Sequence, residues 1–499
     1  MTSDRRGLAA RSAIGLMWTG LSMGGLAVAE LVALIVLARL LAPSEFGLYA
    51  AALVVINFSA IFEGLGVAQA IVQRPVVEES HLRVGFTLSL IFSLSMAGLV
   101  WWAAPTIADL FRLTELAPVV RAACAVFLCR GISMVAQASA QRALRFRWLA
   151  GIEAGAFAIG FVLVGPLLAW RGLGIWALIG ALVCQHFVRM LALLIGQPHP
   201  KRLLLERRAI GHLLYFGGGF TIARIFNYLA GQADKAVVGR WLGAESLGLY
   251  ALASQLMTAP AVIVGQTLDM VLFPTMALIQ QEPARLARAF RGAVASCALL
   301  VLPASVVVMA VLPELVQVLL GPGWENAVLP LQILAAGMLF RTSYKLSDSI
   351  TRATGAVYAR AWRQAVFAFA VGAGSFIGQH WGVTGVALGA VIAVASNFLL
   401  MAQLSLRLTG LKWSDFAVAH LPGVALAVTV GGGAWMFANL LRELHTPPLS
   451  LLGMIVLTTA PASALLCWCA PALFLGHDGR SALQVLMSLA PAWLQRRPT

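Results

Sequence analysis

Charged residues are scarce in this chain: only 11% of its 499 residues are Asp, Glu, Lys or Arg, whereas 60% are hydrophobic. A soluble globular domain is about 25% charged. No long stretch is polar enough to form such a domain, and apolar runs of about 20 residues, sufficient to cross a bilayer as a helix, recur from end to end. The composition therefore excludes a soluble fold and predicts an all-α polytopic membrane protein.

Cysteine is also sparse, and the six cysteines all fall in apolar segments. No CxxC or Cys/His spacing typical of zinc occurs, so we predict no metal site, no structural disulfide and no cofactor. The dipeptide Gly-Lys is absent. This absence excludes a P-loop of the GxxxxGK[ST] type and argues against ATP hydrolysis by this chain.

Fourteen apolar segments are long enough to span a bilayer. The first is longer than the apolar core of a signal peptide and lacks a small-residue cleavage site, so we expect a transmembrane helix there. Glycine recurs at four-residue spacing, which permits close helix approach in lipid. The predicted spans are 13–38, 47–72, 84–104, 117–139, 149–170, 174–195, 212–239, 247–278, 291–312, 328–350, 361–380, 383–406, 416–440 and 450–475.

Lys and Arg are distributed unevenly among the predicted loops. With the N-terminus in the cytoplasm, 23 of the 35 fall in cytoplasmic segments and five in external loops. Because cytoplasmic loops are enriched in Lys and Arg, this bias predicts an even number of spans with both termini inside. The five external arginines are Arg39, Arg112, Arg171, Arg240 and Arg442.

A short motif occurs twice, as ARLLAPSEFGLYA at 38–50 and GRWLGAESLGLYA at 239–251. Arg, Leu, Gly, Leu, Tyr and Ala coincide at an offset of 201 residues. Each copy follows the first span of a six-helix set, so we predict two parallel six-helix repeats, which can rock against each other for alternating access. The predicted division is 1–200 and 201–411 for the two bundles, and 412–499 for two additional helices.

These motifs, together with GLGVAQAIVQR at 64–74 and QRALRFRW at 141–148, resemble the Wzx-type polysaccharide-transport oligosaccharide flippases. That family belongs to the multidrug/oligosaccharidyl-lipid/polysaccharide exporter superfamily. The resemblance implies a MATE-like fold with a central cleft. It also implies translocation of an undecaprenyl-pyrophosphate-linked oligosaccharide from the cytoplasmic to the periplasmic leaflet of a bacterial inner membrane. The setting would be exopolysaccharide, capsule or lipopolysaccharide O-antigen synthesis, with a polymerase and chain-length or export proteins as partners.

Ionisable residues inside spans cost at least about 2.5–3.5 kcal/mol each at the bilayer centre, so their positions are informative. In segment 328–350 they fall at i, i+4 and i+7, on one helical face, and segment 212–239 has a similar face. Several Arg donors can bind a pyrophosphate with bidentate, charge-assisted geometry. We therefore predict a substrate-binding cleft lined by Arg224, Asn227, Tyr228, Arg130, Gln137, Arg341 and Lys345.

Several of these ionisable residues are also compatible with a purely structural role. Arg224 lies close enough to the predicted cytoplasmic surface to be a snorkelling cation. Lys345 and Asp348 are spaced for an i, i+3 pair, and Asp234 with its neighbour Lys235 can form a structural pair. Glu30 can be protonated and hydrogen-bonded at a helix contact.

The energy source has two candidates. The membrane potential is worth about 2.3 kcal/mol per charge per 100 mV and would drive a pyrophosphate outward. The superfamily resemblance implies proton or sodium antiport instead, with Asp234, Glu30 and Asp348 as the first candidate ion-coupling residues.

Two further functions compete with the flippase. A cation-coupled small-molecule exporter would share the fold but predicts an acid-dominated cavity. A membrane polymerase or ligase would need a sizeable external loop and a visible catalytic constellation. The external loops predicted here are mostly under about 15 residues, the usual length of simple connections, so we predict that the chain is not an enzyme.

Overall fold

The computed structural model describes residues 29–62, 67–73, 77–206 and 231–476, together with Gly25, Ile210, Tyr228 and Leu229. These residues are helical or in connecting loops, and no strand occurs among them. Eight helical stretches in the described part are long and apolar enough to cross a membrane. The prediction of an all-α, multi-pass membrane protein is confirmed, and the count of fourteen helices stays a prediction.

The chain divides into two compact units, Met1–Leu252 (unit 1) and Ala253–Thr499 (unit 2). Unit 1 contains α2 (Pro43–Ser59), α3 (Val67–Gln73), α4 (Glu79–Phe111), α5 (Leu116–Ala123), α6 (Ala125–Arg142), α7 (Phe146–Phe157), η1 (Ala158–Val164), α8 (Gly165–Trp170) and α9 (Ile175–Gly196). Helix α11 (Gly243–Leu278) begins in unit 1 and continues into unit 2.

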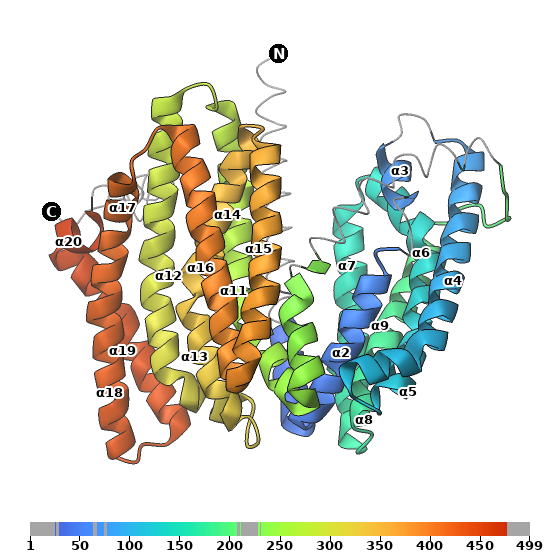
Figure 1. The fold of residues 1–499 in the computed structure, drawn as a ribbon, viewed down its shortest axis with the longest axis horizontal. Helices are drawn as coiled ribbons and strands as arrows, with labels where there is room; N and C mark the ends of the chain where they lie inside the picture. The colour runs from blue at the N-terminus through green and yellow to red at the C-terminus, as the bar shows by residue number, and fades with distance from the viewer. Residues whose placement is uncertain are drawn as a thin grey trace. The chain divides into compact units, whose positions relative to one another are not determined.

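Unit 2 contains the rest of the described chain (Figure 1). Its elements are α12 (Pro283–Leu319), η2 (Glu325–Ala327), α13 (Val328–Ala336), α14 (Met338–Ala353), α15 (Val357–Gly378), η3 (Gln379–Trp381), α16 (Gly382–Thr409), α17 (Trp413–Leu426), η4 (Ala427–Gly431), α18 (Gly432–Glu443), α19 (Pro448–Cys469) and α20 (Pro471–Phe474).

Two predicted spans are wrong as single helices: 328–350 divides into α13 and α14 at Gly337, and 47–72 is interrupted as well. The sequence predicts a continuous segment 47–72, whereas α2 ends at Ser59 and α3 begins at Val67. The end of α2 tightens into a 3₁₀-type turn. The amides of Ile61 and Phe62 donate to carbonyls only three residues back, at 3.1 and 3.0 Å. A count of apolar residues carries no signal for such an end, whereas the glycines at 64 and 66 do.

Proline does distort one predicted span. The turns immediately before Pro166 form the π-helical segment η1. A proline cannot donate to the carbonyl four residues back, and in a membrane helix a local π adjustment can satisfy the groups that this frees. The loss of the Pro166 amide therefore takes the form of a local change in helix type.

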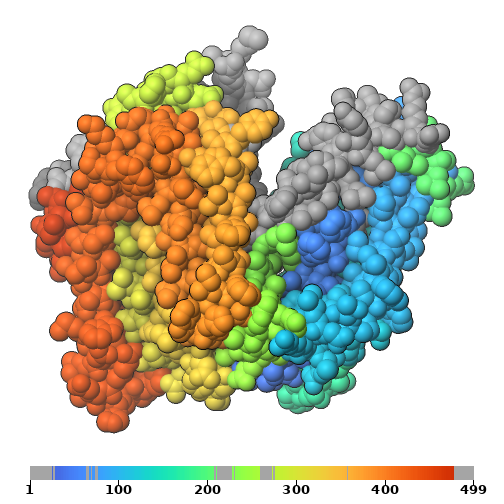
Figure 2. Space-filling view, in the orientation of Figure 1, coloured from blue at the N-terminus to red at the C-terminus, as the bar shows by residue number. Residues whose placement is uncertain are grey.

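Glycine spacing brings α15 and α16 into close contact (Figure 1). A Cβ atom built on Gly378 would lie 2.3 Å from the Gly385 carbonyl oxygen, and one built on Gly389 would lie 2.3 Å from that of Gly374. Both helices carry their glycines four residues apart, as the sequence predicts for close packing. Large apolar side chains are exposed on the same helices, including Phe369, which is 78% exposed, and Ile392, which is 57% exposed. Figure 2 shows this part of the chain in orange on the face drawn there.

The two copies of the sequence repeat contact each other. A Cβ on Gly47 would lie 1.7 Å from the carbonyl oxygen of Ala244, and a Cβ on Gly248 would lie 1.8 Å from that of Pro43. Residues 43 and 244, like 47 and 248, are equivalent at the offset of 201. The contact is therefore reciprocal, as expected where two equivalent segments meet across a local pseudo-two-fold axis.

Helix α18 is fixed to α12 by a mostly buried ion pair. Arg442 donates through Nε and Nη2 to the two carboxylate oxygens of Glu314, at 2.6 and 2.9 Å. It also donates to the Ala310 carbonyl at 2.7 Å and to Asn439 at 2.8 Å. The Glu314 side chain is only 9% exposed. The sequence places Arg442 in an external loop and Glu314 outside the predicted spans, so it misses this pair.

We expect Arg442→Met to lower the free energy of unfolding by roughly 2–4 kcal/mol, because it leaves a buried carboxylate without its cation. The expected loss is below that of a fully buried pair because Arg442 is 33% exposed. Thermal unfolding of the purified protein in detergent measures this loss. Arg285→Met is the matched control, because its partner Glu282 is on the surface and both side chains are more than half exposed. Equal melting temperatures for the two variants would contradict a stabilising pair.

Candidate functional site

Three predicted site residues lie on α14 in unit 2. Arg341, Lys345 and Asp348 are all half-buried on this helix, at the spacing that predicts a shared face. The opposite positions, including Ser343, Ser347 and Ile350, are buried. The sequence prediction of one polar face on this helix agrees with the burial pattern, while the role of that face in binding stays a prediction.

Arg341 reaches toward the neighbouring helix α11. Its Nη1 donates a hydrogen bond to the hydroxyl of Thr258. A guanidinium has five N–H donors, so this contact fixes the orientation of the group while using one of them.

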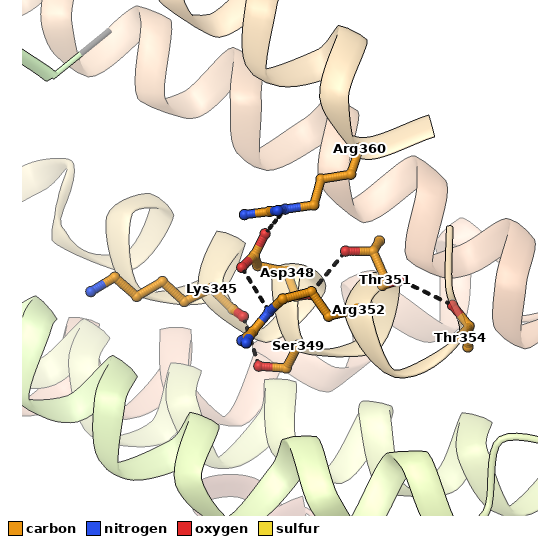
Figure 3. Close-up of polar contacts among 7 residues, drawn as sticks. All are labelled: Lys345, Asp348, Ser349, Thr351, Arg352, Thr354 and Arg360. Carbon is orange, nitrogen blue, oxygen red and sulfur yellow. Dashed lines mark hydrogen bonds and ion pairs between the residues drawn. The ribbon is translucent and has the colours of Figure 1, made fainter. Parts of the chain in front are cut away.

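Asp348 is held by two arginines. Its Oδ2 accepts from Nε of Arg352, one helical turn later, at 3.2 Å, and its Oδ1 accepts from Nε of Arg360 on α15. Figure 3 shows the carboxylate between the two guanidinium groups, with Lys345 on the preceding turn. Asp348 therefore has two arginine partners that the sequence did not pair with it, and the predicted i, i+3 pair with Lys345 stays a prediction.

The predicted site residues of unit 1 have separate surroundings. Tyr228 donates its hydroxyl to the Val54 carbonyl at 2.8 Å, and its ring lies 5.9 Å from that of Phe58. Arg130 and Gln137 are half-buried on α6. Arg224 and Asn227 lie outside the described residues.

The candidate ion-coupling residues differ in their environments. Asp234 is buried and accepts from the Tyr250 hydroxyl at 2.8 Å and from the Lys235 amide at 2.8 Å. Glu30 is exposed and lies close enough to Glu153 to interact with it electrostatically. Among the residues that the structure describes, no group of three or more His, Cys, Asp or Glu could hold a metal ion.

Sequence reasoning missed an ion pair in unit 1. Arg189 of α9 lies 2.9 Å from Glu153 of α7. Glu153 and Arg189 fall in the different predicted spans 149–170 and 174–195, and helical spacing gives no signal for a pair between helices. The same limit applies to Arg360, which the sequence places in a cytoplasmic loop and the structure places on Asp348.

Sequence relatives of this chain are named for polysaccharide assembly. The chain is 29% identical over 325 residues to the succinoglycan biosynthesis transport protein ExoT of Rhizobium meliloti, covering 64% of this chain and 65% of that one. It is 25% identical to the lipopolysaccharide biosynthesis protein WzxC of Escherichia coli, covering 77% and 79%. It is also 25% identical to the teichuronic acid biosynthesis protein TuaB of Bacillus subtilis, covering 68% and 71%.

Solved structures share the fold. The lipid II flippase MurJ matches with a TM-score of 0.70 at 12% identity, over 86% of this chain and 99% of that one. An inward-facing multidrug resistance MATE transporter of the MOP superfamily matches with a TM-score of 0.60 at 16% identity, over 77% and 95%. A family described as "Polysaccharide biosynthesis protein" matches residues 36–329. Because this match covers more than half of the chain and confirms the predicted resemblance, the protein belongs to the polysaccharide biosynthesis protein family.

Proposed function

We propose that this protein is a flippase that moves an undecaprenyl-pyrophosphate-linked oligosaccharide across the bacterial inner membrane. The observation that carries the proposal is the family match over residues 36–329. The relatives are named for three different polymers, succinoglycan, lipopolysaccharide and teichuronic acid. A step common to such different sugars would act on a shared carrier rather than on one sugar.

The residues of α14 support an anionic substrate. Arg341, Lys345 and the two arginines on Asp348 give this part of unit 2 an excess of positive charge. Cationic groups next to hydroxyl-bearing side chains suit a pyrophosphate attached to a sugar. We infer that Arg224, Asn227, Tyr228, Arg130 and Gln137 supply further contacts. The chain would bind and release its substrate without covalent chemistry.

The distribution of Lys and Arg supports an orientation of the chain in the membrane. We propose that both termini are cytoplasmic, since 23 of the 35 Lys and Arg then fall on the cytoplasmic side. The substrate would enter from that leaflet and leave on the periplasmic side for a polymerase of the same pathway. The bundles 1–200 and 201–411 would rock against each other, with 412–499 as additional helices. The membrane potential, or ion coupling through Glu30, Asp234 or Asp348, would drive the step.

The test is a depletion strain in which undecaprenyl-pyrophosphate-linked repeat units are quantified and assigned to a leaflet. We expect completed units to accumulate facing the cytoplasm while polymer disappears. If incomplete units accumulate, or complete units reach the periplasmic face unpolymerised, the protein is an enzyme of assembly instead.

A further inference from the structure

The turn between α14 and α15 gathers three charged side chains from two helices. Asp348 and Arg352 lie on the last two turns of α14, and Arg360 lies on the first turn of α15. Asp348 is 17% exposed, whereas Arg352 and Arg360 are 36% and 35% exposed. The carboxylate is therefore the most buried member, and the two guanidinium groups lie nearer the surface.

The contact with Asp348 occupies only part of the Arg360 guanidinium. The structure gives this contact through Nε alone, and a guanidinium carries four further N–H groups on Nη1 and Nη2. In Figure 3, Arg352, Arg360 and Lys345 extend toward the same side of the view. Taken together, the three cations and the Asp348 carboxylate carry two net positive charges. Arginine pairs match the geometry of phosphate oxygens.

Aromatic residues on α15 place this cluster at the depth of lipid headgroups. Tyr358 and Trp362 flank Arg360 in sequence and are 91% and 49% exposed. Exposed Tyr and Trp at the end of a transmembrane helix are typical of the membrane–water interface. The interface is also where the phosphate groups of lipids lie, so the cluster is at the depth of a phosphate ligand.

We propose that Asp348 is a positioning residue that holds Arg352 and Arg360 together as a receptor for the phosphate or pyrophosphate group of an anionic lipid. The identification of this ligand as the pyrophosphate of the lipid-linked oligosaccharide rests on the proposed function. A phospholipid headgroup offers the same chemistry. In this assignment Asp348 acts through the two arginines and does not carry a coupling ion.

The inference is tested with the full chain in phosphatidylcholine nanodiscs, using inorganic pyrophosphate as the probe in calorimetry. R352Q and R360Q are each expected to weaken binding about tenfold or more, the usual effect of losing one charge-assisted hydrogen bond. R288Q is the matched control, because Arg288 is an exposed arginine of α12 that donates only to Ala284 of its own helix among its described contacts. Its affinity should stay within about twofold of the unmodified chain, well below the effect of a charge-assisted bond.

D348N separates positioning from simple attraction. It raises the local charge by one, so attraction alone predicts tighter binding, whereas loss of positioning predicts weaker binding. We expect weaker binding in D348N, with partial recovery in D348E. Tighter binding in D348N, or unchanged binding in both R352Q and R360Q, overturns the inference. Melting temperatures near that of the unmodified chain show that each variant is folded.

A second arm identifies the source of the phosphate. Nanodiscs containing phosphatidylglycerol are compared with those of phosphatidylcholine alone, and lipid that co-purifies is identified by mass spectrometry. Pyrophosphate binding in both membranes supports the lipid-linked substrate. Phosphatidylglycerol enrichment that R360Q abolishes supports a phospholipid headgroup. The leaflet assay of the depletion strain is independent of both arms, so failure of this inference and failure of the flippase proposal can be told apart.

Discussion

Gly47→Ala and Gly248→Ala are each expected to abolish polymer output and to lower the free energy of unfolding by more than about 3 kcal/mol, above the usual cost of overpacking. A methyl group at either position would lie within 2 Å of a backbone carbonyl oxygen of the other repeat copy. Backbone atoms in two helices cannot turn aside as a side chain can. Helices α2 and α11 would have to separate.

Two other glycines provide controls: the same Gly→Ala substitution there is expected to stabilise the protein slightly instead of destabilising it. Gly98 lies in α4 and Gly292 in α12, and a Cβ on either would meet nothing within 4 Å. Alanine is favoured over glycine in a helix by about 0.5–1 kcal/mol. Gly98→Ala and Gly292→Ala should therefore leave thermal unfolding and polymer output unchanged or slightly improved. A Gly47→Ala variant that melts and transports like these controls would show that the contact does not constrain the protein.

The repeated motif shows how identical residues acquire different roles. Tyr49 lies edge-on to Phe161, with ring centroids 6.4 Å apart. Its equivalent Tyr250 donates a hydrogen bond to Asp234 instead. The position equivalent to Asp234 at the same offset is Ala33. The repeat thus preserves backbone packing, through Gly47 and Gly248, while polar partners differ between the copies.

Helical periodicity predicts those features that depend on one helix or on a short motif. It places Arg341, Lys345 and Asp348 on one face of α14, and it identifies the glycine spacing that lets α15 and α16 approach each other. The sequence also reveals the repeat whose copies are in contact. Each of these depends on residues a few positions apart, where the geometry of a helix is fixed.

Features that depend on pairing between helices could not be predicted. Glu314 and Arg442 are 128 residues apart, and their pairing follows from how α18 packs on α12. The break after Ser59 is followed by the sequence EGLG at 63–66, a helix-ending signal that a count of apolar residues overlooks. Spacing alone does not reveal that Arg360 contacts Asp348 from α15, so the sequence offers that carboxylate as a candidate for ion coupling.

Arg341→Gln is expected to lower translocation, and with it polymer output, about 10-fold to 150-fold, the usual effect of removing one charged hydrogen bond to substrate. Arg341 is half-buried and oriented by Thr258, so its charge is held in place on the polar face of α14. Glutamine is similar in length but has neither the charge nor the paired donors that match a pyrophosphate. The measurements are polymer output and the leaflet distribution of lipid-linked units in a strain that carries only the variant.

Two matched variants separate the charge of Arg341 from its hydrogen bond. Thr258→Val removes the acceptor and keeps the cation, so we expect most of the output to remain. Arg341→Lys keeps the charge and loses the fork of donors, so we expect an intermediate result. Membrane levels and melting temperatures should match the unmodified chain in all three, because a neutral side chain in a span costs less than a charged one. Normal output from Arg341→Gln, with the protein present at its usual level, would show that this cation does not contact the translocated anion.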